Sequence, residues 1–353
     1  MPVLFCFFIL FSLSIFVTKV FADITTFIPT SEKNKYLFSK YNLGFSKEKY
    51  LFKSSFQDGT IEVSREFHVS SNFSTKSQEQ QTSIHVLHYR IHNRMNLSSQ
   101  KAAPILVLHG GPGVPSDYLY PLTEVIPYRS IVFYDQLGSG RSPGPEHIDA
   151  YSIEKSLDDL ELLIKKLNIR RFHLYGQSFG GILAFEYLKR VAEKKNSGDD
   201  QPECLSVILS STPSNVEQVE ASANILMDNL LVEDDDMSSL PERFRLQNQC
   251  RIPEKPQSLV DAYSHAGTVW RGTDVIKDWK AKGPADGASR MPSALVMRGE
   301  HDFVSDECVQ GWKKVFNHPF VRIKVLDGCS HHGLLENGRE YGDIVDSYCS
   351  EYD

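Results

Sequence analysis

Short, uninterrupted apolar runs alternate with amphipathic segments along most of this chain. Two of the runs, 104–110 and 130–136, read PILVLHG and SIVFYDQ. Runs of the same kind lie at 171–177, 205–211, 292–300 and 320–328. Strands that are apolar along their whole length are typical of a parallel sheet covered on both faces. Helical spacing between the runs, as in 153–167, predicts the covering helices, so we expect an α/β fold with a mostly parallel central sheet.

Two other regions depart from this alternation. Residues 59–69 and 82–92 alternate apolar and polar side chains, which predicts a half-buried β-hairpin ahead of the parallel strands. Residues 213–280 contain helical stripes and an acidic run but no buried strand, which predicts an inserted helical cap of modest size. We therefore expect the core to consist of two parts, 59–212 and 281–353, on either side of the cap.

The first 22 residues predict a secretory signal peptide. An apolar run over 3–17 is followed by a small-x-small pattern that ends at Ala22. Because no Lys or Arg precedes the run, a retained signal anchor is the alternative, although about 15 apolar residues are short for a membrane span. Residues 23–58 show no clear period and are expected to form an extended N-terminal segment. We expect a secreted or lumenal protein with no stable membrane span after cleavage.

Short motifs in the rest of the chain bear on this route. N-x-S sequons make Asn72 and Asn96 candidates for N-glycosylation. The cysteines beyond the signal peptide are odd in number, which leaves at least one free thiol or an intermolecular bridge, and their pairing stays open. No two of them are spaced as a C-x-x-C pair, so a zinc site is not expected. They are Cys204, Cys250, Cys308, Cys329 and Cys349.

The motif G-x-S-x-G occurs at Gly176, Ser178 and Gly180, where a buried run meets a helical stripe. A chain of this length shows the pattern by chance about one time in ten, so the motif alone does not identify a nucleophile. Between a strand and a helix, however, it forms an elbow that exposes the serine hydroxyl beside the amides of a helix N-terminus. A hydroxyl is a weak nucleophile at neutral pH, so it needs a histidine base and a carboxylate to orient that base.

Both partners follow Ser178 in the order serine, acid, histidine. Asp302 comes just past the run 292–300, and His331 and His332 come just past the last predicted strand. The carboxyl ends of parallel strands meet at one edge of a sheet, where such sites assemble. The order and the placement together predict a catalytic triad.

The loop HGGPG, from His109 to Gly113, follows the first buried strand. Its glycines leave the backbone free to turn amide groups toward a substrate. An oxyanion hole needs two such N–H groups, one from this loop and one from the residue after the nucleophile. We expect Gly111 and Phe179 to provide them.

Three motifs together carry a family resemblance. HGGPG is followed about 20 residues later by DQLGSGRS, from Asp135 to Ser142, and then by GQSFGG. This set resembles the proline iminopeptidase branch of the α/β-hydrolases, which includes the tricorn-interacting aminopeptidases. The likeness covers roughly residues 80 to 350 and extends to TDVIKDW and CSHHGLLEN. It implies an α/β-hydrolase fold with a small helical cap and the removal of N-terminal residues, often proline, from short peptides; some relatives hydrolyse amino-acid amides.

The resemblance also bears on single positions. It places the catalytic histidine at His331, with His332 behind it. Family members fix the substrate's amino group with cap carboxylates, because a buried ammonium needs a paired charge. Where the tricorn-associated members carry a glutamate ahead of TDVIKDW, this chain has Gly267. The substrate-binding residues stay unassigned, with four cap carboxylates as open candidates: Glu217, Glu220, Glu242 and Glu254.

These observations predict a secreted serine hydrolase, an aminopeptidase that acts through an acyl-enzyme on short peptides or on amino-acid amides or esters. Its triad is Ser178, Asp302 and His331, and neither a metal nor an organic cofactor is expected. Asp135 and Arg141 are expected to brace the loop under the site. An esterase or lipase-like enzyme or an amino-acid amidase with the same triad is one alternative, and an inactive hydrolase-fold binding protein is another. A nucleic-acid partner is not expected, because the formal net charge is -7 and the basic residues are scattered.

Overall fold

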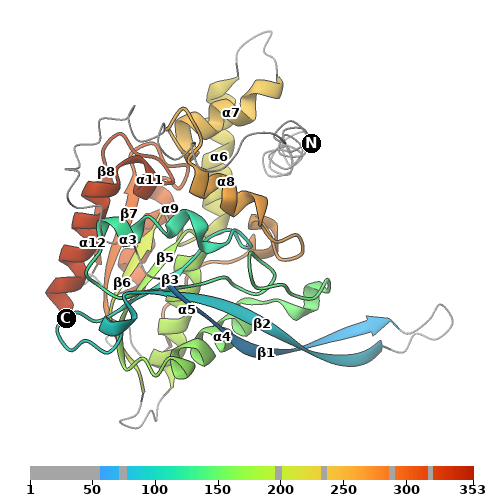
Figure 1. Cartoon of the computed structure of the whole chain (residues 1–353). Helices are drawn as coiled ribbons and strands as arrows, with labels where there is room; N and C mark the ends of the chain where they lie inside the picture. The colour runs from blue at the N-terminus through green and yellow to red at the C-terminus, as the bar shows by residue number, and fades with distance from the viewer. Residues whose placement is uncertain (1–55, 71–77, 195–200, 232–236, 286–290, 317–320) are drawn as a thin grey trace, which may run out of the picture. The chain divides into compact units, whose positions relative to one another are not determined.

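Eight strands form one sheet in the order β1-β2-β4-β3-β5-β6-β7-β8 (Figure 1). Pairing is antiparallel between β1 and β2 and between β2 and β4, and parallel between all other neighbours. The predicted α/β fold with a mostly parallel sheet is therefore confirmed. The strands are β1 Phe56–Ser70, β2 Gln78–His92, β3 Ile105–Leu108, β4 Ile131–Tyr134, β5 Arg171–Gln177, β6 Glu203–Ser210, β7 Ser293–Gly299 and β8 Val321–Leu326.

The computed structural model describes residues 56–70, 78–194, 201–231, 237–285, 291–316 and 321–353. The predicted signal peptide, most of the predicted N-terminal segment and the Asn72 sequon lie outside these residues. The other sequon residue, Asn96, is exposed, and its side-chain amide donates a hydrogen bond to the Tyr128 carbonyl at 2.9 Å. In the part of the chain that is described, no helix is both long and apolar enough to cross a bilayer. Among the described residues, all five cysteines are free thiols: Cys204, Cys250, Cys308, Cys329 and Cys349.

Helices lie between most of the successive strands, and the helix pairs that pack together include α4 with α5 and α12 with α3. Ser152 caps α4 by accepting a hydrogen bond from the Lys155 N–H at 3.1 Å. The α-helices are α3 Leu122–Val125, α4 Ile153–Lys166, α5 Phe179–Glu193, α6 Val216–Leu230, α7 Leu240–Phe244, α8 Gln257–Ser264, α9 Asp306–Gln310, α10 Trp312–Val315, α11 Gly333–Glu336 and α12 Gly338–Tyr352. The short helical turns are η3 Arg94–Asn96, η4 Ser116–Leu119, η5 Ile148–Ala150, η6 Met237–Ser239, η7 Arg245–Gln249 and η8 Thr273–Ile276.

The hairpin of β1 and β2 has the predicted alternation, with every second side chain buried from Ile61 to Phe67. Its first strand begins at Phe56, earlier than the predicted start at residue 59. The Phe56 ring packs on the Tyr120 ring at 5.4 Å between centroids, and the Arg90 guanidinium lies 4.9 Å from its centroid. These contacts extend the strand past the point where the sequence alternation stops. Figure 1 shows the hairpin reaching out beyond the other strands.

Between β6 and β7 the chain forms the helices α6, α7 and α8 and the turns η6, η7 and η8. We refer to this segment as the cap; Figure 1 shows α6, α7 and α8 grouped at one end of the sheet. The turn η7 is a π-helix. Its last two carbonyls, those of Asn248 and Gln249, accept hydrogen bonds from the backbone N–H groups of His331 and His332 at 3.4 and 3.1 Å. The cap therefore lies over the carboxyl ends of the strands.

Hydrogen bonds to the Asp353 side chain hold the end of α12 against the sheet. The Asp353 carboxylate accepts hydrogen bonds from the Arg129 guanidinium at 2.8 Å and from the Ala103 N–H at 2.7 Å. It also lies 3.1 Å from Nε2 of His173. Because Nε2 faces a carboxylate it carries the proton, so Nδ1 accepts the Ser206 hydroxyl at 2.8 Å. This arrangement uses His173 in its neutral form.

Stability is expected to fall as pH decreases from about 6.5 to about 4, because of His173. Burial lowers the pKa of His173 from 6.5 to about 4, although the neighbouring Asp353 acts in the opposite direction. Between these pH values His173 is protonated in the unfolded chain but neutral in the folded protein. Acid therefore lowers the free energy of unfolding, by about 3 kcal/mol at pH 4. Urea unfolding at a series of pH values should show a smaller pH dependence for His173→Gln than for the exposed-site control His265→Gln. Equal pH dependence in the two variants would contradict this assignment.

Candidate active site

Ser178 occupies the turn between β5 and α5. Its backbone has φ 54° and ψ -119°, a strained conformation for a residue with a side chain. Gly180, the second residue of the helix, lies so close to β3 that a Cβ there would be 2.0 Å from the Leu108 carbonyl oxygen. This close approach explains the second glycine of the motif. The strand, turn and helix that G-x-S-x-G requires are all present.

Asp302 and His331 are hydrogen-bonded, with 2.9 Å between Asp302 Oδ1 and His331 Nδ1. The Asp302 side chain is fully buried, and the Val304 N–H also donates to Oδ1 at 2.9 Å. The Phe303 ring stacks on the imidazole with centroids 4.2 Å apart. Since a carboxylate only accepts, Nδ1 is the donor, and a neutral His331 keeps its lone pair on Nε2. The loops after β7 and β8 thus bring together two residues that are separated by 29 positions in the sequence.

The Nε2 atom of His331 points to the elbow. It lies 3.0 Å from the side-chain amide nitrogen of Gln177, the residue directly before Ser178. Among the described residues, no hydrogen bond joins the Ser178 hydroxyl to His331. Catalytic hydrogen bonds are often long in the absence of substrate and shorten when it binds. The imidazole is therefore adjacent to the nucleophile candidate but bonded to its neighbour.

His332 lies behind His331, as the resemblance implied. Its ring meets the His331 and Tyr118 rings edge-on, each with centroids 5.3 Å apart. Burial, with a smaller contribution from His331, holds the pKa of His332 well below 6.5, so this imidazole is neutral. It makes no contact with Asp302 of the kind that His331 makes.

The two oxyanion-hole candidates border the same elbow. Gly111 has φ 122°, and its N–H group forms no hydrogen bond within the described part of the chain, whereas the Gly110 N–H donates to the Tyr118 hydroxyl at 2.8 Å. Phe179 is the first residue of α5, where an N–H group has no acceptor within the helix. The loop rests on the elbow, because a Cβ on Gly110 would be 2.4 Å from Gln177 Oε1. Neither predicted oxyanion-hole amide, that of Gly111 or that of Phe179, is thus engaged by an acceptor among the described residues.

The four cap carboxylates that the sequence left as open candidates are exposed or ion-paired. Glu217, Glu220 and Glu254 are exposed, and Glu242 pairs with Arg245 at 2.6 Å. Gly267 is buried, and its N–H donates to the Gly113 carbonyl at 2.8 Å. A Cβ at this position would be 2.3 Å from the Gly138 carbonyl oxygen. The backbone packing therefore leaves no room at residue 267 for the glutamate that the tricorn-associated members carry.

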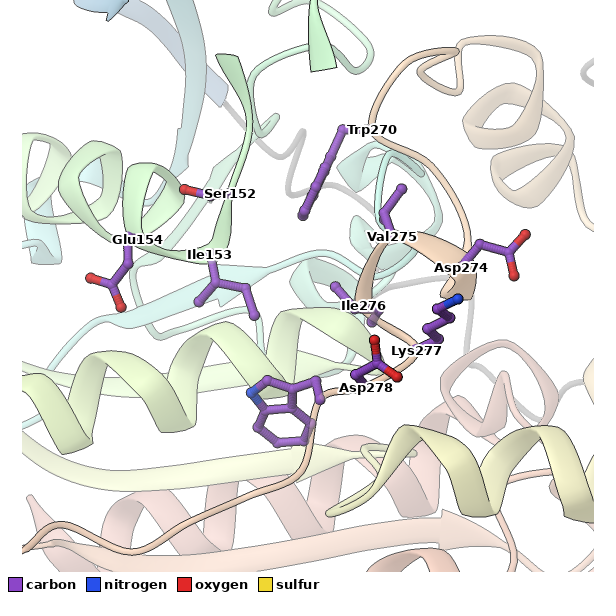
Figure 2. A pocket seen from close by; sticks show the side chains of 10 residues that line it. Ser152, Ile153, Glu154, Trp270, Asp274, Val275, Ile276, Lys277 and Asp278 are labelled. Carbon is purple, nitrogen blue, oxygen red and sulfur yellow. The ribbon is translucent and has the colours of Figure 1, made fainter. Parts of the chain in front are cut away.

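A hollow of about 360 Å³ lies between the start of α4 and the segment around η8 (Figure 2). Figure 2 shows the Trp270 indole standing between Ser152 and Val275. None of the predicted catalytic residues lines this hollow. We therefore place the candidate active site at the carboxyl ends of β5, β7 and β8, where the nucleophile and base candidates lie. No group of three or more potential metal ligands occurs among the residues that the structure describes.

Comparison with known proteins identifies the family. Residues 103–303 match the sequence profile of a family described as alpha/beta hydrolase fold. The chain belongs to the α/β-hydrolase family. The hydrolase is 26% identical over 296 residues to proline iminopeptidase from Lactobacillus helveticus, covering 75% of this chain and 96% of that one. The predicted resemblance to the proline iminopeptidases is thus confirmed.

Solved structures agree with this fold. The proline iminopeptidase of Mycobacterium smegmatis superposes with a TM-score of 0.62 at 23% identity, covering 76% of the hydrolase and 95% of that chain. The protein VinJ superposes with a TM-score of 0.64 at 22% identity, covering 82% of the hydrolase and 99% of that chain. At such identities the likeness establishes the fold.

In the hydrolase, reciprocal hydrogen bonds join the DQLGSGRS segment to the HGGPG loop, which is the predicted oxyanion loop. The Gln136 N–H donates to Nε2 of His109, and the Gln136 side chain donates to the His109 carbonyl, both at 2.8 Å. Asp135 accepts from the Ser116 hydroxyl at 2.8 Å and from the Arg141 N–H at 2.9 Å. Burial would raise the pKa of Asp135, but His109 and these hydrogen bonds outweigh it and hold the pKa below its usual range. These contacts agree with a bracing role for Asp135 and Arg141.

The sequence did not predict two residues of the site, Gln177 and Tyr118. Gln177 is one of the variable positions of G-x-S-x-G, and Tyr118 lies in η4 beyond the HGGPG loop. Both are buried and hydrogen-bonded to each other at 2.7 Å. The only available signal was a glutamine in an otherwise apolar strand end.

Proposed function

We propose that this hydrolase is a secreted serine aminopeptidase that releases N-terminal residues from short peptides. Ser178 is the nucleophile, His331 the general base and Asp302 the carboxylate that orients it. The observation that carries the proposal is the 2.9 Å bond between Asp302 and His331, with Nε2 directed to the strained elbow that holds Ser178. The similarity to proline iminopeptidases over most of the chain supports the substrate class.

The proposed reaction follows from the positions of the donors and acceptors. His331 keeps its Nδ1 proton and donates it in the hydrogen bond to Asp302. At Nε2 it takes the Ser178 proton while Oγ attacks the carbonyl carbon. The amides of Gly111 and Phe179 hold the oxygen on which negative charge develops. His331 then gives the proton to the leaving amine, which leaves an acyl-enzyme. A water molecule deprotonated by His331 hydrolyses that ester and restores Ser178.

An aminopeptidase also needs a group that binds the substrate's amino group. Position 267 has no room for a carboxylate, and the four cap glutamates considered are exposed or ion-paired. An ammonium group left in an enclosed site without a paired charge would bind poorly. This observation favours a second candidate function, in which the same triad acts as an amidase or esterase on substrates without a free amine.

A substrate panel separates these functions. The purified mature protein is offered prolyl and alanyl arylamides, their N-acetylated forms and a short-chain aryl ester, and kcat/KM is measured for each. Turnover of the free-amine arylamides, with the N-acetylated forms at least about 100-fold slower, is expected for an aminopeptidase that pairs the ammonium. Turnover restricted to esters would move the assignment to an esterase. No turnover of any compound would favour an inactive binding protein.

The secretory route is part of the same proposal. It rests on the apolar N-terminal run that ends at Ala22 and on the exposed sequon residue Asn96. Protein secreted by a eukaryotic host is expected to begin at Asp23 and to lose mass on treatment with an N-glycosidase. An intact N-terminal Met in the folded product would contradict cleavage.

A further inference from the structure

A chain of buried hydrogen bonds runs from the oxyanion loop to the candidate triad. The Gly110 N–H donates to the Tyr118 hydroxyl at 2.8 Å, and that hydroxyl donates to Gln177 Oε1 at 2.7 Å. The Gln177 amide nitrogen lies 3.0 Å from Nε2 of His331, and Nδ1 of His331 lies 2.9 Å from Asp302. All of these groups are buried or lie on the backbone of a buried residue. The side chain of Gln177 links the two halves of this series of hydrogen bonds.

The direction of every bond in this chain is fixed by its two ends. A backbone N–H only donates, so the Tyr118 hydroxyl accepts from Gly110 and has its own proton to give to Gln177 Oε1. The amide NH2 of Gln177 then faces His331 and only donates. His331 Nε2 must therefore accept, which places the single ring proton on Nδ1. At the other end Asp302 accepts from Nδ1, so both ends require the same tautomer.

We propose that Gln177 is a positioning residue that holds His331 in the tautomer with a basic Nε2 and couples this imidazole, through Tyr118, to the oxyanion loop. The inference rests on the proposed function for its role in catalysis, but the tautomer itself can be measured without any activity. His331 can act as the base for Ser178 only in this tautomer, because an Nε2 atom that already carries a proton cannot take the Ser178 proton.

Gln177 acts on the resting enzyme. Before the reaction, the Nε2 lone pair accepts a hydrogen bond from the Gln177 N–H. As the substrate arrives, the same lone pair also accepts a hydrogen bond from the Ser178 hydroxyl. When the Ser178 proton moves to Nε2, the lone pair is used and the Gln177 N–H loses its acceptor. The bond between Tyr118 and Gln177 Oε1 does not change in this step. The glutamine therefore keeps its place while the proton is transferred.

A purely space-filling role for Gln177 predicts a different outcome. An unbranched apolar side chain of similar length, as in Gln177→Met, fills the same volume but leaves the Tyr118 hydroxyl without its acceptor and Nε2 without its donor. If positioning matters, Gln177→Met lowers kcat by about 10- to 100-fold while KM changes little, because small misplacements of a catalytic group have effects of this size. Wild-type kcat in a variant with an unchanged melting temperature would overturn the inference.

The decisive variant is Gln177→Glu, which replaces the donor facing Nε2 by a carboxylate oxygen. The groups that face His331 are then Asp302 on one side and the new carboxylate on the other, with the uncharged rings of Phe303 and His332 against the imidazole. Two carboxylates favour a doubly protonated ring. The acid limb of the pH–kcat/KM profile is expected to move upward by at least about one pH unit. Gln218→Glu, which adds the same charge on the exposed face of α6, is the matched control and should leave the profile unchanged.

Nitrogen-15 NMR of histidine-labelled protein provides the readout that is independent of turnover. In a Ser178→Ala background, His331 is expected to show one N–H at neutral pH with Gln177 present and two with Gln177→Glu. The same single N–H in both proteins would overturn the inference, whatever the activity assays show. If Ser178→Ala retained full turnover while the NMR result held, the proposed function would fail and the hydrogen-bond network would stand.

Discussion

Replacing Ser178 by alanine is expected to lower kcat for the best arylamide or ester by at least about 10,000-fold. The Oγ atom forms the bond to the substrate carbonyl, and no other residue at the elbow offers a nucleophile. The fold should persist, because the backbone of residue 178 is held by its own N–H bond to the Ser210 carbonyl at 2.8 Å. Residual turnover from the two oxyanion amides and from substrate binding is expected to remain about 1,000-fold above the uncatalysed rate.

Steady-state kinetics and active-site titration with a fluorophosphonate check this result. Wild-type protein should incorporate one label per chain and Ser178→Ala none. Ser64→Ala, an exposed serine on β1, provides the control for changes that affect stability or purity only. Full activity in Ser178→Ala would show that the mechanism is wrong.

The neighbouring histidines are expected to differ by more than about 1,000-fold in their effect on kcat. His331→Gln removes the group that bonds to Asp302 and approaches the elbow, so activity should fall as far as in Ser178→Ala. His332→Gln changes a ring that packs edge-on against Tyr118, and a small loss, within about tenfold, is expected from altered packing. The two variants carry the same substitution at adjacent positions, so each is the matched control of the other.

Kinetics and thermal unfolding should be measured on both variants. Similar melting temperatures with very different kcat values are the expected result. Greater loss of activity in His332→Gln than in His331→Gln would show that the catalytic register is shifted by one residue. It would also remove the basis for assigning a positioning role to Gln177.

The features that the sequence predicted correctly are local or follow from topology. Apolar runs such as 104–110 gave strands because a strand buried on both faces needs apolar side chains throughout. The pairing of Asp302 with His331 was predictable because parallel strands end at one edge of the sheet, which brings the loops after β7 and β8 together. Neither prediction required knowledge of side-chain directions.

The features that the sequence did not reveal depend on contacts between distant segments. Tyr118 and Gln177 are 59 positions apart, and only the folded backbone shows that the hydroxyl of one meets the amide of the other. The closed position at Gly267 depends on a carbonyl of residue 138, which no spacing rule connects to the cap. The early start of β1 depends on the ring contacts of Phe56. In each case a tertiary contact, rather than a propensity, decides the outcome.

The π-turn η7 has a consequence for how this protein could acquire a new specificity. Its Asn248 and Gln249 carbonyls hold the backbone of the histidine pair, and the Asn248 side chain donates to the His301 carbonyl beside Asp302 at 3.0 Å. Grafting a foreign cap in place of 216–276 would therefore misalign the base unless these five residues were kept. Variation should be tolerated at exposed positions of α6, such as Gln218. An engineer who wants a different substrate should treat η7 as part of the catalytic core and redesign the helices around it.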